Sequence, residues 1–368
     1  MARSEFGVYV HIPFCKRRCG YCAFATYTDR DHLMLRYADA CVAEIGRARS
    51  AGLPPATSVF FGGGTPSRLA PDELGRILAA LELAPGAEVS VECNPEDASE
   101  ERFAVYRASG VTRLSFGVQS TVPHVLAALD RHHDPARVGR VATWAWAAGF
   151  ASYNIDLIFG AAGETDADWE RSLHDILALD HPPPHVSAYA LTVEPGTPLA
   201  ADPAGHPDDD VQARRYERAD EVLAGAGYRW EEVSNWARPG HGCRHNRLYW
   251  TQGDYLGIGS AAHSHRQGHR WWNVRTPDRY VAAVEAGRSA VAADERVDGD
   301  RRRFEALALA LRTPGGVPDA ALAPAPELEG LVERRSGRAV LTRRGRLLAN
   351  AVTARLEVGG DPAGILRP

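Results

Sequence analysis

Long apolar segments are absent from this sequence of 368 residues. No run approaches the roughly 18 apolar residues that cross a bilayer, and the opening residues lack the basic-then-apolar pattern of a secretory signal. We therefore expect a soluble cytoplasmic protein. An excess of one charge is also absent, because 42 Lys and Arg oppose 47 Asp and Glu and leave a net charge of −5. Domains that bind nucleic acid usually carry a basic excess, so we expect no nucleic-acid partner.

Sulfur-containing residues are few. Methionine occurs only at Met1 and Met34, which nearly excludes it as a metal ligand. Six cysteines are too few to form the disulfide scaffold of a chain this long. Three of them, Cys15, Cys19 and Cys22, fall within eight residues. In a reducing compartment such a cluster indicates a metal or redox site.

Short apolar runs alternate with helical patterns through the first half of the chain. The candidate strands are Val8–Ile12, Val59–Phe61, Val89–Glu92, Arg113–Gly117, Tyr153–Phe159 and Val186–Leu191. The candidate helices are Asp31–Ala51, Pro71–Leu83, Ser99–Ser109, Pro135–Ala148 and Thr165–Leu179. This alternation predicts an α/β fold with a parallel sheet. Right-handed crossovers then bring the carboxyl ends of all the strands to one rim, where ligands bind.

Changes in composition and periodicity divide the chain into three parts, 1–235, 236–293 and 294–368. The first part closes with a helical pattern at Asp210–Ala226 and a strand pattern at Tyr228–Val233. The second is rich in His and Trp and shows little periodicity through about residue 273, so we expect an irregular connecting region. The third has helical patterns and one candidate strand that enters the last helix, as in a winged-helix arrangement. These patterns are Phe304–Leu311, Arg338–Leu341 and Arg343–Arg355.

The three clustered cysteines follow the first candidate strand with C-x₃-C-x₂-C spacing. Three thiolates on one short loop can hold three corners of a cubane iron–sulfur cluster and leave the fourth iron open. The intervening basic residues Lys16, Arg17 and Arg18 are expected to lower the thiol pKa values. A structural zinc site is the alternative, with His11 as the only nearby fourth ligand.

Five segments resemble one family of radical S-adenosylmethionine (SAM) proteins, the family of oxygen-independent coproporphyrinogen III oxidases and the HemW haem chaperones. They are Tyr9–Cys15, Phe61–Ser67, Glu92–Pro95, Ser115–Ser120 and Asn154–Gly160. The resemblance implies a TIM-like partial (βα)₆ barrel over 1–235, closed by 236–293 and followed by a small, mostly helical domain. It also implies a [4Fe-4S] cluster whose open iron is chelated by SAM.

The same resemblance assigns SAM contacts to residues at or near the predicted rim. They are Tyr9, Gly63, Gly64, Thr65, Glu92, Gln119, Arg131, Asp156 and Ala190. Alternatives remain for several of them. Taken alone, the glycines are a turn, Arg131 is a solvated cation at a helix end, and Ala190 is a core residue.

Four of the eight tryptophans and five histidines gather between residues 236 and 272. Flat aromatic surface and a His or Cys ligand are what a haem site needs, but a Trp-packed loop with exposed histidines has the same composition. His245–Trp250 is similar to the H-N-x-x-Y-W motif of HemW proteins. The resemblance implies His245 as the axial haem ligand, with Cys243 as a weaker candidate.

Two departures separate the chain from the oxidases of this family. Phe24 occupies the position where they carry a further cysteine, and they have a longer segment before the cluster. We therefore expect a haem chaperone that transfers haem to acceptor proteins, not the decarboxylating oxidase. A radical SAM enzyme with another substrate is a third hypothesis. Cleavage of SAM would require an electron donor such as a flavodoxin or ferredoxin, and a cluster-dependent homodimer is a further expectation.

Overall fold

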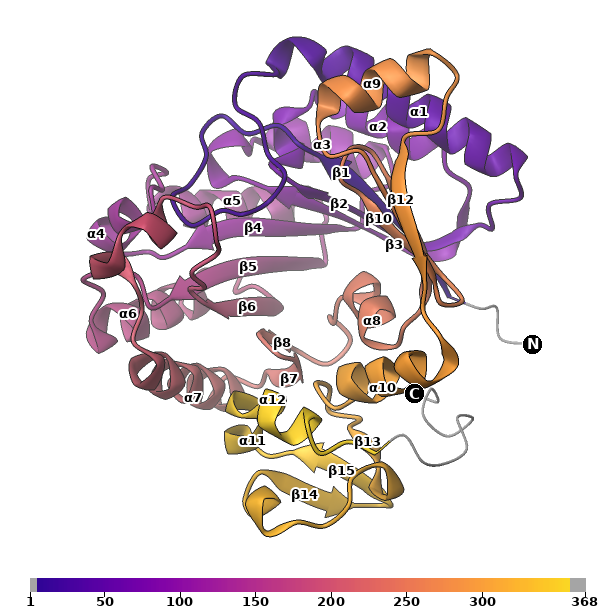
Figure 1. Cartoon of the computed structure of the whole chain (residues 1–368). Helices are drawn as coiled ribbons and strands as arrows, with labels where there is room; N and C mark the ends of the chain where they lie inside the picture. Colours follow the sequence, from indigo (N-terminus) through magenta and orange to yellow (C-terminus); the bar gives the residue numbers. More distant parts are fainter. Residues whose placement is uncertain (1–4, 358–368) are drawn as a thin grey trace.

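The computed structural model describes residues 5–357, and its main feature is a curved sheet of twelve strands (Figure 1). Six consecutive strands at its centre are parallel. They are β1 (Phe6–Ile12), β2 (Ala56–Gly63), β3 (Leu83–Cys93), β4 (Arg113–Gln119), β5 (Ser152–Phe159) and β6 (His185–Ala190). All six strands predicted from the sequence are confirmed. Most of these strands are longer than predicted. Polar residues on the hollow side of the sheet interrupt the apolar runs from which the strands were predicted.

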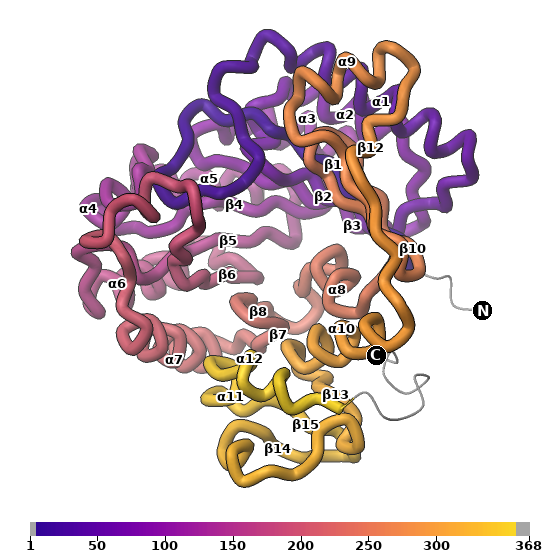
Figure 2. The backbone as a smooth tube through the Cα atoms, viewed as in Figure 1, coloured from indigo at the N-terminus to yellow at the C-terminus, as the bar shows by residue number. Residues whose placement is uncertain are grey.

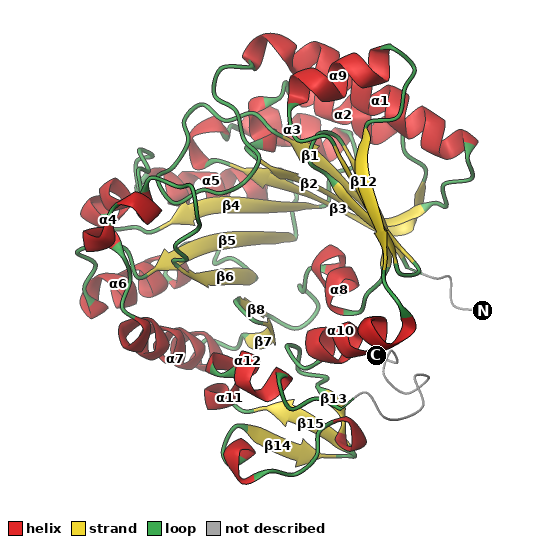
Figure 3. Ribbon diagram, in the orientation of Figure 1, coloured by secondary structure: helices red, strands yellow, loops and turns green. Residues whose placement is uncertain are grey.

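Helices cover the outer face of these strands (Figure 3). They are α1 (Met34–Ser50), α2 (Pro71–Ala79), α3 (Glu100–Ala108), α4 (Pro123–Ala128), α5 (Arg137–Ala147), α6 (Asp166–Leu177) and α7 (Asp209–Gly225). Local chemistry sets their ends, as in α6, where Thr165 and Asp168 form a reciprocal capping box. The helix predicted to reach Leu83 ends at Ala79 instead, because Leu83 already pairs with Ala56 in the sheet.

The expectation of irregular structure after residue 236 is wrong. The segment forms α8 (Arg244–Trp250), β9 (Asp254–Ile258), β10 (His263–Arg266), β11 (His269–Asn273), α9 (Pro277–Glu285) and β12 (Val291–Arg296). We call β9–β12 the wing. Strand β9 pairs parallel to β1, so the wing extends the sheet beside strands from the other end of the sequence (Figure 2). These strands are short and polar on the hollow face, which hides their period of two.

The chain after the wing packs around a hydrophobic cluster of its own that includes Leu307, Leu311, Val317 and Leu341. Its elements are α10 (Gly299–Ala310), β13 (Val317–Pro318), β14 (Val332–Arg335), β15 (Arg338–Leu341), α11 (Arg343–Leu347) and α12 (Ala349–Thr353). The predicted strand is confirmed as β15, which leads directly into α11.

Two short strands, β7 (Arg229–Glu232) and β8 (Asn235–Ala237), extend the opposite end of the sheet from the wing. Between them, the two extensions curve the sheet around a hollow face, onto which α8 packs from inside against β1 and β2. None of the helices in residues 5–357 is both long and apolar enough to span a bilayer.

Candidate functional site

The loop that follows β1 carries the three clustered cysteines. It is fixed at its base because the Cys15 N–H donates to the Tyr27 carbonyl and the Tyr27 N–H donates to the Pro13 carbonyl. Cys15, Cys19 and Cys22 are half-buried free thiols. A hydrogen bond of 3.4 Å joins the Cys15 sulfur to the Thr65 hydroxyl at the end of β2. The thiols therefore stand at the carboxyl end of the parallel strands, as the sequence predicts.

The pKa values of Cys15 and Cys22 are not lowered overall, although the sequence predicts that basic neighbours lower them. Burial raises the pKa of both thiols above the ordinary value, and Cys19 adds to the rise at each of them. Arg18 lowers the pKa of Cys22, but by less than burial raises it. Lys16, Arg17 and Arg18 are exposed, so solvent screens their charge. Cluster assembly must therefore remove protons from the Cys15 and Cys22 thiols, whose raised pKa values keep them neutral at pH 7.

The glycine triplet at the end of β2 brings backbone against backbone. A Cβ on Gly64 would lie 2.9 Å from the carbonyl oxygens of both Ile12 and Phe14. A Cβ on Gly63, whose φ is +115°, would lie 2.4 Å from the His11 ring. The triplet is thus more than a turn, because it seats the cysteine loop against β2.

Two carboxylates stand on the hollow face of β3 and β5, the strands on either side of β4. Glu92 accepts a hydrogen bond of 3.1 Å from the Gly63 N–H, and its burial, with the nearby charge of Asp156, raises its pKa to about 8. Asp156 accepts hydrogen bonds from the Ser115 hydroxyl at 3.2 Å and the Asn154 amide at 2.8 Å. Burial raises the pKa of Asp156 as well. Such a pair favours a ligand that brings positive charge or hydroxyl donors.

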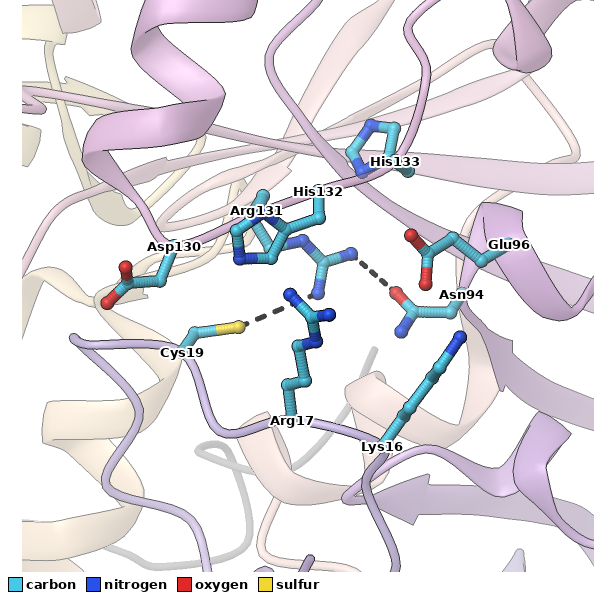
Figure 4. Close-up of a pocket in the computed structure, with 9 residues that line it drawn as sticks. All are labelled: Lys16, Arg17, Cys19, Asn94, Glu96, Asp130, Arg131, His132 and His133. Carbon is cyan, nitrogen blue, oxygen red and sulfur yellow. Dashed lines mark hydrogen bonds between the residues drawn. The ribbon is translucent and has the colours of Figure 1, made fainter.

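Arg131 is half-buried and is not the solvated cation that the sequence left open. Its guanidinium donates to Asn94, to the Gly117 carbonyl and, at 3.7 Å, to the Cys19 sulfur. Figure 4 shows the contacts with Asn94 and Cys19 in the pocket that also contains Lys16, Arg17, Glu96, Asp130, His132 and His133. Within the described chain, the Arg131 Nε and the Gln119 Oε1 are buried without a hydrogen-bond partner. Unpaired polar atoms at the rim are what a polar ligand would satisfy.

The remaining predicted SAM contacts lie at or near the same end of the sheet. The Tyr9 hydroxyl is 3.0 Å from His11 Nδ1, and the Tyr9 ring stacks on Phe60 at a centroid distance of 6.4 Å. Ala190 is exposed at the end of β6, so it is not a core residue. Thr65 is buried beside Cys15. The structure thus gathers the predicted cysteine and SAM residues at one end of the sheet.

His245 lies elsewhere, at the floor of the hollow face. It contacts Ser58, five residues before Gly63 on β2, which puts it about 15 Å from the rim. Its side chain is fully buried, with Nδ1 at 3.0 Å from the Ser58 hydroxyl and Nε2 at 2.9 Å from the Tyr249 hydroxyl. Cys243 is also buried, and its thiol donates to Glu88. Neither side chain presents a free ligand atom in this conformation.

Several known proteins are similar in sequence to this chain. Residues 9–176 match the model of the Radical SAM superfamily. The heme chaperone HemW of Mycobacterium tuberculosis is 44% identical over 97% of this chain and 96% of its own length. The heme chaperone HemW of Bacillus subtilis is 31% identical over 94% of this chain and 97% of its own length. The chain belongs to the HemW family.

A solved structure supports the fold of this HemW-family chain. The coproporphyrinogen III oxidase HemN of Escherichia coli, a radical SAM enzyme, aligns with a TM-score of 0.83. The alignment covers 95% of this chain and 89% of that one at 24% identity. The fold is therefore the radical SAM partial barrel of six parallel βα units with a C-terminal domain, as the sequence resemblance implied.

The cofactors of a radical SAM protein are a [4Fe-4S] cluster and SAM, and the described residues fit both. Within residues 5–357, no three His, Cys, Asp or Glu side chains converge on a point as they would around a single ion. Each thiolate of a cubane binds a different iron, so three spaced cysteines on one loop suit it. The glycine cradle, the two carboxylates and the unpaired atoms of Arg131 and Gln119 suit SAM.

Sequence reasoning considered His11 only as a zinc ligand and missed its place in this HemW-family site, and it missed His133 altogether. The His11 ring packs against Gly63 and bonds to both Tyr9 and the Ala25 carbonyl, and burial lowers its pKa to about 4. Its position two residues after Tyr9 on β1 was the available signal, because alternate residues of a strand share a face. Both ring nitrogens of His133 are buried without a partner in the described chain, and no pattern in the sequence singles it out.

Proposed function

We propose that this chain is a haem chaperone, which binds haem and passes it to acceptor proteins while carrying a [4Fe-4S] cluster and SAM. The observation that carries the proposal is its identity of 44% with a heme chaperone over almost the full length of both chains. Phe24 adds support. It occupies the position of the further cysteine of the oxidases, and its side chain is 67% exposed beside the cluster loop.

The chain's own residues have separate tasks in this proposal. Cys15, Cys19 and Cys22 hold the cluster, which supplies an open iron to chelate SAM. The Arg131 guanidinium keeps positive charge beside Cys19, where the anionic cluster needs it. The Glu92 carboxyl gives up its proton when a cationic ligand arrives, since its pKa of about 8 reflects burial without a cation. Tyr9, Gly63, Gly64, Thr65, Gln119, Asp156 and Ala190 complete the SAM contacts.

The partners are part of the same proposal. The acceptors are haem proteins of unspecified identity, and cytoplasm is the compartment. A one-electron donor of the flavodoxin or ferredoxin type would bind at the cluster loop. The exposed basic side chains of Lys16, Arg17 and Arg18 would attract an acidic surface on that donor. A homodimer that forms when the cluster is loaded is tested by light scattering before and after reconstitution.

An oxygen-independent coproporphyrinogen III oxidase is the second candidate, favoured by the close overlap of the backbone with HemN. A haem chaperone binds haem and releases it unchanged, whereas the oxidase consumes coproporphyrinogen. Haem titration of anaerobically reconstituted protein, followed in the Soret band, should show stoichiometric binding, and the bound haem should transfer to apomyoglobin. With dithionite as reductant, 5′-deoxyadenosine should not form in step with loss of coproporphyrinogen. Rapid stoichiometric porphyrinogen consumption without haem binding would establish the oxidase instead.

A further inference from the structure

The hollow face of the wing carries an exposed histidine that no assignment above uses. Residues paired across strands share a face, and alternate residues along a strand return to it. Tyr255 pairs with Gly7, and His265 pairs with Tyr255. His263 is two residues from His265, and it pairs with Trp272. The side chains of His263 and Trp272 therefore lie on the face onto which α8 packs.

His263 and Trp272 form a flat, accessible pair. Their ring centroids are 5.5 Å apart, with an angle of 22° between the planes. His263 is exposed, and neither of its ring nitrogens makes a hydrogen bond to any part of the chain between residues 5 and 357. An unprotonated imidazole nitrogen is the usual protein ligand of haem iron. Partial burial holds the pKa of His263 below its ordinary value, which keeps the imidazole neutral.

The pair also borders the cluster and SAM rim. Gly257 of β9 pairs with Tyr9, and a Cβ on Gly257 would lie 2.2 Å from the His263 carbonyl oxygen. Tyr9 in turn contacts His11, which packs against Gly63. A ligand on His263 would therefore extend from the wing toward the rim, whereas a ligand on His245 would be enclosed at the floor.

The other exposed or half-buried histidines of the segment either make hydrogen bonds through their ring nitrogens or have no aromatic ring stacked on them. His265 makes hydrogen bonds as well. His265 uses Nδ1 with the Gly253 carbonyl and Nε2 with the Gly268 N–H. His269 bonds to Asp294 through Nε2. His241 is half-buried near the guanidinium groups of Arg113 and Arg238, and no aromatic ring in the described chain stacks on it.

We propose that His263 is the residue that ligates haem iron and that Trp272, stacked on the imidazole, holds that ring in its orientation. His245 is then a positioning residue that holds α8 to β2. This inference rests on the proposed haem-chaperone function and names the ligand that function would use. It replaces His245 and Cys243, which the sequence motif favours, by a residue outside the motif.

The test compares haem binding by the full, reconstituted chain and its variants, with Soret spectra, electron paramagnetic resonance and dissociation constants as readouts. H263A should bind haem at least tenfold more weakly and lose the signal of histidine ligation. H263G should regain that signal when imidazole is added. W272L should weaken binding and keep the ligation signal. The matched control H241A, also a histidine of this segment, should behave as the wild type.

The outcomes separate the two proposals. Wild type that binds haem together with H263A of unchanged spectrum and affinity would overturn the ligand assignment and leave the haem chaperone standing. Loss of the histidine signal in H245A and not in H263A would overturn it as well, and would return the role to the motif. Wild type that binds no haem would overturn the proposed function, and the ligand assignment with it.

Discussion

The Glu92 carboxylate and the Gly63 backbone N–H are joined by a hydrogen bond of 3.1 Å between the carboxyl ends of β3 and β2. This contact places a buried acid directly beside the glycine cradle that seats the cysteine loop. The acid has no cation as a partner in the described structure, and its pKa is raised to about 8. Protonation of Glu92 and occupation of the rim by a cationic ligand are therefore coupled.

Replacing this acid should change how stability depends on pH. The folded pKa of Glu92, about 8, exceeds its ordinary value of 4.5, so the folded protein binds this proton more tightly than the unfolded chain. The free energy of unfolding should therefore fall as pH rises from about 4.5 to about 8. In Glu92→Gln that fall should be reduced, and Tm at pH 8 should rise by about 2–4 °C. Thermal unfolding of the apoprotein at several pH values measures it, with Glu101→Gln, an exposed residue of α3, as control.

The same Glu92→Gln variant should bind SAM at least tenfold more weakly, because the neutral amide cannot balance a cationic ligand. Equilibrium binding to the reconstituted protein tests this. A SAM affinity equal to that of wild type would remove Glu92 from the site.

Serine in place of Cys15, Cys19 or Cys22 should abolish the cluster. Serine offers no thiolate, and each cysteine is expected to ligate a different iron. Iron and sulfide content and the visible spectrum after anaerobic reconstitution measure the loss. Cys41→Ala is the control, because this thiol is buried in α1 away from the loop. Equal iron content in wild type and a triple-serine variant would refute the cluster assignment.

Gly64→Ala should disrupt the seat of the loop. Its Cβ would lie 2.9 Å from two backbone carbonyl oxygens, so the loop or β2 must shift. We expect SAM affinity to fall at least tenfold. Gly46→Ala is the control, since the new methyl meets nothing within 4 Å in α1 and should stabilise the protein by about 0.5–1 kcal/mol. Unchanged SAM binding in Gly64→Ala would show that the loop tolerates the displacement.

His245→Ala should destabilise the protein even when no haem is present. The substitution leaves a cavity and removes the partner of two hydroxyl groups, those of Ser58 and Tyr249. We expect a loss of about 2–4 kcal/mol in the free energy of unfolding, measured with urea. Ser58→Ala removes one of the two bonds and should cost about 1 kcal/mol. A His245→Ala apoprotein as stable as wild type would contradict the positioning role.

Patterns within single segments predicted most of the barrel and the rim. Apolar runs such as Tyr153–Phe159 mark buried parallel strands regardless of context, and the cysteine spacing marks a loop by itself. The wing escaped prediction because its strands are four to six residues long and polar on one face, and because β9 pairs with β1 from the other end of the chain. Pairing over such a sequence distance leaves no local pattern.

The environment of side chains was the least predictable part of the site. The motif singled out His245, which is a buried hydrogen-bonding residue, but it did not predict that burial. The burial of His245 depends on how α8 packs on β1 and β2. The prediction of lowered thiol pKa values failed because it also depends on burial. Lys16, Arg17 and Arg18 adjoin the cysteines in sequence and are exposed. The fold partly buries the Cys15 and Cys22 thiols, and this burial raises their pKa values.

Strand β1, which leads into the cysteine loop, is paired on both sides, with β2 on one and β9 on the other. The order of events in maturation follows from this position. The strand is held by ladders of backbone hydrogen bonds on both sides, so the sheet can form without iron. A newly made chain should therefore fold first and receive its inorganic sulfide and iron afterwards, on a scaffold that is already rigid.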